Sequence, residues 1–80
     1  MPCYHFNIRD GRGLTRDDEG LDLSSATDAR ALAIKGARSL ISADVLDGAL
    51  DLSGQIEITD DEGDDVMTIR FRDAVRVHRK

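Results

Sequence analysis

The residues best suited to chemistry lie at the start of the chain. Cys3 and His5 are two positions apart, so in a β-strand their side chains would point to the same face. A thiolate and an imidazole at that spacing can ligate zinc, but a structural zinc site has four ligands. Only His78 and the acidic residues remain to complete the set, and no CxxC or HxxxH pair is present. We therefore expect no metal site, and no Cys3 nucleophile, because nothing in the pattern orients His5 as a base.

Pro2 is a second candidate, because removal of Met1 would leave a free prolyl amine at the start of a strand. The tautomerase superfamily uses such an amine as a general base. A similarity to it implies an anionic substrate bound by arginines, here Arg9, Arg12 and Arg38. Tautomerases run directly from strand to helix to strand, whereas this chain places a hairpin before its helix. We expect Pro2 only to begin a strand and the protein not to be an enzyme, with a tautomerase-like enzyme as an alternative.

The acidic run at residues 60–65 invites comparison with a calcium-binding loop. An EF-hand loop has glycine at position six and glutamate at position twelve. Counting from Asp60, these positions hold Asp65 and Phe71, so a solvated turn is the better interpretation. The sequence also lacks GxGxxG, GxxxxGKS/T, GxSxG and HExxH motifs, and we expect no cofactor.

Charge is divided unevenly along the chain. Residues 1–69 contain 15 acidic and 6 basic residues, a net charge of −9, whereas residues 70–80 carry a net charge of +4. The acidic body should repel nucleic acid phosphates. We therefore expect no nucleic acid partner except through the basic C-terminal segment, whose cations are Arg70, Arg72, Arg76, Arg79 and Lys80. The first three would share one face if this segment were extended.

Alternating hydrophobicity predicts several short strands. Runs with a period of two occupy residues 3–9, 14–16, 21–23, 55–59 and 66–71. A glycine-rich turn at residues 10–13 follows the first run. The tetrapeptide DDEG occurs at residues 17–20 and again at 60–63, each time between alternating segments. A type I turn closed by a left-handed glycine explains both copies.

A proline-free segment rich in alanine and leucine predicts a helix from Ser24 or Ser25 to about Leu46, with Gly48 as a left-handed cap. Gly36 costs about 1 kcal/mol of helix propensity relative to alanine, which makes sense if the helix lies close on a sheet there. The apolar stripe of this helix consists of Ala29, Leu32, Ala33, Gly36, Ala37, Leu40 and Ile41. We expect Leu32, Ala33, Gly36, Leu40 and Ile41 to be buried against the sheet. The opposing sheet face would carry Tyr4, Phe6, Ile8, Ile58 and Ile69.

These elements predict one α+β domain, residues 1–80, with one long helix packed on one face of an antiparallel sheet of four to five strands. The predicted order is strand, strand, strand, helix, strand, strand. The end of the chain allows two interpretations: Val75 and Val77 extend a final strand, or Asp73 and Ala74 begin a short helical turn. We expect residues 76–80 to fray.

The order and spacing of several motifs resemble a family of small bacterial proteins known only as a domain of unknown function. The motifs span nearly the whole chain: YxFxI and DG at residues 4–11, DEGxxL at 18–23, ARA at 29–31, DLSG at 51–54, IxIxD at 56–60 and FxDAV at 71–75. The resemblance implies a fold and a compartment but no activity. A looser similarity to HicB-type antitoxins covers about the first half of the chain and implies an antitoxin-like protein that binds a toxin or an enzyme.

Size and composition set the remaining expectations. Folding hides roughly 60% of the surface of so small a chain, so self-association would bury more apolar area. The first predicted strand, residues 3–9, has no proline or glycine and could pair with a copy of itself. No apolar run approaches the ~20 residues of a membrane span, no signal peptide is evident, and a single cysteine suits a reducing compartment. We expect a small cytoplasmic interaction or regulatory domain, a homo-oligomer with no membrane association that could also bind another protein.

Overall fold

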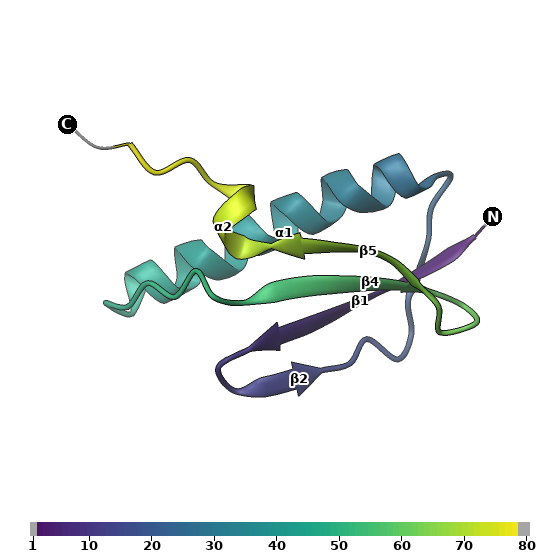
Figure 1. Cartoon of the computed structure of the whole chain (residues 1–80), viewed down its shortest axis with the longest axis horizontal. Helices are drawn as coiled ribbons and strands as arrows, with labels where there is room; N and C mark the ends of the chain where they lie inside the picture. The colour runs from purple at the N-terminus through teal and green to yellow at the C-terminus, as the bar shows by residue number, and fades with distance from the viewer. Residues whose placement is uncertain (1, 79–80) are drawn as a thin grey trace.

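Five strands form one open antiparallel sheet. One long helix packs on one of its faces (Figure 1). The computed structural model describes residues 2–78. The elements follow one another as predicted, which confirms the α+β fold. In chain order they are β1 (Cys3–Asp10), β2 (Gly13–Thr15), β3 (Leu21–Asp22), α1 (Ala26–Leu46), β4 (Gln55–Asp60), β5 (Asp65–Arg70) and α2 (Phe71–Ala74).

β1 is an inner strand of the sheet. One of its edges pairs with β4, from Tyr4 opposite Asp60 to Arg9 opposite Gln55. Its other edge pairs with β2 at one end and with β3 at the other. The predicted pairing of this strand with a copy of itself is therefore wrong, because both edges are occupied. Among the described residues β5 pairs only with β4, and it forms a free edge of the sheet.

Local capping explains where α1 begins and ends. The Ser25 hydroxyl accepts a hydrogen bond from the backbone N–H of Asp28 at 3.3 Å, and the Ser24 hydroxyl donates to the Asp28 carboxylate. Beyond the other end, Gly48 has a φ of 88°, the left-handed conformation that glycine adopts at little cost. Both ends agree with the sequence prediction.

The buried face of α1 is narrower than the predicted apolar stripe. α1 packs mainly over β4 and β5, and its buried side chains are Ala29, Ala33, Ala37 and Ile41. Leu32 and Leu40 flank this stripe and are 39% and 36% exposed, so their predicted burial is wrong. The small alanine side chains face the sheet and let the helix lie close to it. With the alanines in this orientation, Leu32 and Leu40 lie on the flank of the helix.

The sheet face beneath α1 holds the core. Tyr4, Ile58 and Ile69 are buried there as predicted, whereas Phe6 and Ile8 on β1 are only half-buried, because α1 lies toward β5. Ile58 is the only large side chain among the described residues that is fully buried. The core is therefore thin, as expected for a chain of this length.

The end of the chain folds as a short helix rather than as a strand. The Phe71 backbone N–H donates to the Gly54 carbonyl at 2.9 Å, and the Phe71 ring packs so closely that a Cβ on Gly54 would lie 2.7 Å from it. The Arg38 Nε donates to the Ala74 carbonyl at 2.7 Å and ties α2 to α1. Val77 is exposed. Of the predicted frayed tail, residues 79–80 lie outside the described residues.

No helix within residues 2–78 is both long enough and apolar enough to cross a membrane.

Candidate functional site

The sheet face opposite α1 is polar and carries a shallow groove of about 420 Å³. Side chains of β1 and β4 form its floor, and the turns after β2 and β4 form its walls. Carboxylates outnumber cations along it: Asp17, Asp18, Glu57, Asp60 and Asp61 stand against Arg9 and Arg16. The groove should therefore favour a cationic ligand over an anionic one.

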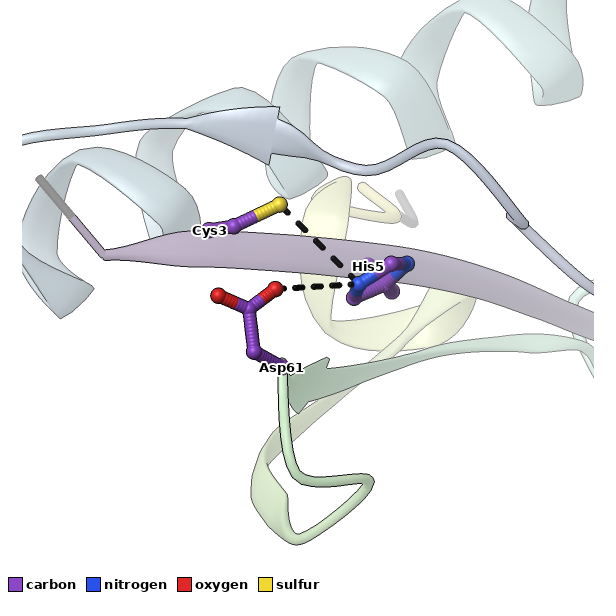
Figure 2. Close-up of side chains that lie close together, drawn as sticks. All are labelled: Cys3, His5 and Asp61. Atoms are coloured by element: carbon purple, nitrogen blue, oxygen red, sulfur yellow. Dashed lines mark hydrogen bonds and ion pairs between the residues drawn. The ribbon is translucent and has the colours of Figure 1, made fainter.

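His5 and Asp61 line this groove, and Cys3 lies beside them, so the three side chains form a cluster (Figure 2). The His5 Nε2 lies 3.9 Å from the Cys3 Sγ and 3.5 Å from the Asp61 Oδ1. Cys3 and His5 come from one face of β1, as the spacing predicts, and Asp61 comes from the turn after β4. The register that sets Tyr4 opposite Asp60 brings Asp61 beside them.

Asp17 fixes the orientation of the His5 ring. The Asp17 carbonyl lies 2.7 Å from the His5 Nδ1, and because a carbonyl only accepts, Nδ1 carries the proton. The Asp17 carboxylate accepts from the backbone N–H groups of Phe6 at 3.0 Å and Gly20 at 3.1 Å, and the Asp17 N–H donates to Asn7 at 2.9 Å. β2 and β3 pair with the two ends of β1, and Asp17 bonds to the residues of β1 between them. From the sequence alone, Asp17 is predicted only to be part of the turn at residues 17–20.

Gly20 lets the turn pass directly over Cys3 and His5. Its φ is 72°, and a Cβ there would lie 2.6 Å from the Cys3 Sγ and 2.9 Å from the His5 Cε1. The Cys3 thiol lies 3.9 Å from the Glu19 carbonyl, to which it can donate. The acidic turn at residues 17–20 thus holds both side chains in place.

The electrostatics of the cluster argue against a reactive thiolate. Burial raises the pKa of the Cys3 thiol, and a hydrogen bond with Asp61 and the charge of that carboxylate raise it further. The hydrogen bond to Asp17 raises the pKa of His5 against the opposing effect of burial, and Asp61 adds to the rise. A catalytic cysteine needs cationic surroundings that lower its pKa, and these surroundings are anionic.

An ion pair also lines the groove. The Arg9 Nε lies 2.7 Å from the Glu57 carboxylate, which also accepts from the Gln55 amide at 2.6 Å. The hydrogen bond from Arg9 lowers the pKa of Glu57, and that from Gln55 lowers it further. Arg9 is therefore engaged and does not point toward Pro2.

The structure does not bring the other sequence candidates together. Pro2 is exposed at the start of β1, whereas Arg12 lies in the turn beyond its far end and Arg38 binds the Ala74 carbonyl. His78 is exposed after α2 and does not join the Cys3 cluster.

The acidic turn after β4 is built by its own aspartate. The Asp60 carboxylate accepts from the backbone N–H groups of Glu62 and Asp64 at 2.9 and 3.0 Å, and Gly63 has a φ of 83°. This is the exposed turn closed by a left-handed glycine that the sequence predicts.

The basic segment is not the extended strand that would align its arginines. Arg70 pairs with Asp73 at 2.9 Å, while Arg72 and Arg76 are exposed on and after α2. Arg79 and Lys80 lie outside the described residues.

A second groove of about 470 Å³ is apolar and runs beside α1, over the half-buried part of β1. Leu32 and Leu40 line it from the helix, and Phe6 and Ile8 line it from the sheet. It exists because α1 lies toward β5 and leaves this side of the core partly covered.

Comparison with known proteins supplies a family but no chemistry. No curated protein and no solved structure matches the chain. The similarity to HicB-type antitoxins therefore stays a prediction. One family profile does match, over residues 3–72, which include every strand and α1. The chain belongs to this family, a domain of unknown function designated DUF6894.

Proposed function

We propose that this chain is a non-enzymatic interaction module that pairs with a second copy of itself along the free edge of β5. The observation that carries the proposal is that the outer edge of β5 has no strand paired with it among the described residues. β5 is six residues long, contains no proline or glycine, and pairs on one side only among the described residues. Natural sheets usually protect such an edge, because its unpaired N–H and C=O groups can accept another strand.

The charges at the two ends of β5 suit an antiparallel partner of the same sequence. Five acidic residues lie at the start of β5: Asp65 begins the strand, Asp61, Glu62 and Asp64 are in the turn before it, and Asp60 ends β4. Arg70 ends β5, and Arg72 and Arg76 follow it with exposed side chains. A two-fold axis through the middle of β5 would set the acidic end of each copy beside the basic end of the other. Like ends would face each other in a parallel arrangement.

The small hydrophobic core gives the chain a reason to dimerise, because a dimer would bury apolar surface that the single chain leaves exposed. Four of the ten buried apolar residues are alanines, and Ile58 is the only large side chain fully buried in the described part of the chain. Val66 and Met67 on β5 are half-buried and would gain cover from a neighbouring strand. Extending the sheet across the axis would add apolar burial that one chain of this length lacks.

Thr68 offers a direct test, because it is exposed near the middle of β5. In the proposed dimer it lies close to Thr68 of the second copy, so Thr68→Lys places two like charges together. We expect light scattering to report a dimer for the native protein and at least about tenfold weaker association for Thr68→Lys. Thr27→Lys, the same change at an exposed position of α1, should leave the dimer intact. A monomer mass at every concentration up to the millimolar range would overturn the proposal, as would a dimer indifferent to Thr68→Lys.

The non-enzymatic part of the proposal is supported by the placement of the tautomerase candidates. Pro2 precedes β1, whereas Arg9 and Arg12 lie near and beyond the other end of that strand. Arg38 is engaged with the Ala74 carbonyl. Pro2→Ala should leave the circular dichroism spectrum and the dimer mass unchanged. A keto–enol activity on α-keto acids that is present in the native protein and lost in this variant would overturn it.

A further inference from the structure

We infer that Cys3, His5 and Asp61 form a binding site for a divalent cation of the zinc class. All three donor atoms lie within 4.8 Å of one another, with the His5 Nε2 at 3.9 Å from the sulfur and 3.5 Å from the carboxylate oxygen. Zinc bonds of about 2.0–2.3 Å in a tetrahedron place such atoms about 3.4–3.6 Å apart. The three atoms are therefore spaced nearly as ligands of one ion.

The His5 ring is oriented for this role. Its Nδ1 proton is donated to the Asp17 carbonyl at 2.7 Å, so the lone pair of the neutral ring lies on Nε2, toward Cys3 and Asp61. Histidines that ligate metals commonly donate their other ring nitrogen to a carbonyl or carboxylate in this way.

Two of the ligands are closely confined and the third is free to adjust. Cys3 and His5 lie on β1 beneath Gly20, where a Cβ would collide with both side chains. The His5 side chain is 21% exposed, whereas that of Asp61, on the turn, is 65% exposed. A small rotation of Asp61 would bring its carboxylate to the distance of a ligand without disturbing the sheet, and a small change in the Cys3 rotamer would shorten its 3.9 Å distance to His5.

The donor set selects the class of ion. A thiolate with an imidazole suits zinc or cobalt, whereas calcium and magnesium prefer oxygen ligands alone. Asp17, Asp18 and Asp60 line the same groove and raise the local concentration of cations. Three protein ligands leave the fourth position to water. The sequence predicted no such site because its spacing showed only Cys3 and His5.

Titration of the reduced, untagged protein with Co²⁺ tests the inference, because cobalt reports its ligands by absorption. We expect one ion per chain, with a thiolate-to-metal charge-transfer band and the visible bands of tetrahedral coordination. Zn²⁺ should displace the cobalt and raise the melting temperature of the native protein.

Three variants and one control complete the test. Cys3→Ser, His5→Gln and Asp61→Asn should each weaken binding at least about tenfold. Asp64→Asn makes the same change in the same turn, outside the cluster, and should leave the affinity within about twofold. Melting curves without metal will show that each variant folds. Cobalt binding without the charge-transfer band would exclude Cys3, and equal weakening by Asp64→Asn and Asp61→Asn would reveal only a general attraction to the acidic turn. Either result, or no binding, would overturn the inference.

Discussion

Asp17 illustrates how one residue can replace a stretch of strand. Its carboxylate, N–H and carbonyl each bind a different group of β1, where neither β2 nor β3 reaches. Burial by itself would raise the pKa of the Asp17 carboxyl, but the hydrogen bonds from the Phe6 and Gly20 N–H groups outweigh it and hold the pKa below its usual value. The folded state thus favours the charged carboxylate.

The direction of that shift predicts how stability depends on pH. Because the folded pKa of Asp17 lies below the unfolded value, its contribution is complete above about pH 4 and is lost as the pH falls through the folded pKa. Asp17→Asn should lower the free energy of unfolding by about 1–3 kcal/mol at pH 7 and flatten its dependence below pH 5. Urea titrations of both proteins at several pH values measure this. Asp18→Asn, at the exposed neighbour, is the control, and parallel curves for native protein and Asp17→Asn would contradict the prediction.

Gly20 and Gly63 occupy the same position in the two DDEG turns and both have positive φ, at 72° and 83°. Only Gly20 has neighbours within reach of a Cβ, whereas nothing lies within 4 Å of one on Gly63. Gly63→Ala should therefore cost about 1 kcal/mol, from backbone strain alone. Gly20→Ala should cost at least about 1 kcal/mol more, because Cys3 and His5 must also move. Equal shifts in thermal melts of the two variants would disprove the close contact.

At the scale of elements, the orientation of α1 about its own axis decides which of two adjacent apolar side chains contributes to the core. Ile41 is buried, whereas its neighbour Leu40 is on the flank. Leu40→Ala should cost about 1 kcal/mol or less, and Ile41→Ala about 2–4 kcal/mol. Chemical denaturation of the two variants checks the ratio. A larger loss for Leu40→Ala would place Leu40, not Ile41, in the core.

Position 36 of α1 does not require glycine. A Cβ there would lie 3.9 Å from the Ile56 Cδ1, which is ordinary van der Waals contact, and no positive φ calls for glycine. Gly36→Ala should therefore stabilise the protein by up to about 1 kcal/mol through helix propensity. A lower melting temperature in this variant would mean that helix and sheet approach more closely than these distances indicate.

The sequence was sufficient for what depends on neighbours along the chain. Strand alternation, the Ser25 cap and the Gly48 stop are local signals, and the structure confirms them. The face of α1 was predicted less well, because hydrophobicity favours Leu40 whereas close packing on a sheet favours Ala37. In the candidate site, the spacing of Cys3 and His5 was readable, but Asp61 joins them only through the register of β1 and β4.

For the whole molecule, the proposed dimer predicts that hydrogen exchange will depend on protein concentration only along the β5 edge of the sheet. Amide hydrogen exchange at residues 65–70 should slow as protein concentration rises, because a second copy would bond the exposed N–H groups of β5. Exchange at residues 26–30, at the start of α1, should not depend on concentration. Mass spectrometry of exchanged peptides measures both. Slowing along the Leu32 and Leu40 side of α1 instead would move the interface to the apolar groove.

The position of β1 also has a consequence for synthesis of the protein. β1 leaves the ribosome before α1, yet β4, which pairs along most of its length, follows only after α1 is complete. A nascent chain therefore carries Phe6 and Ile8, which are half-buried in the folded protein, without their neighbouring strand until β4 has been made. Strand pairing across so long an interval slows folding, whereas α1 can form early from local contacts. The sheet can close only after β4 has left the ribosome, and until then β1 is exposed to misassociation with other chains.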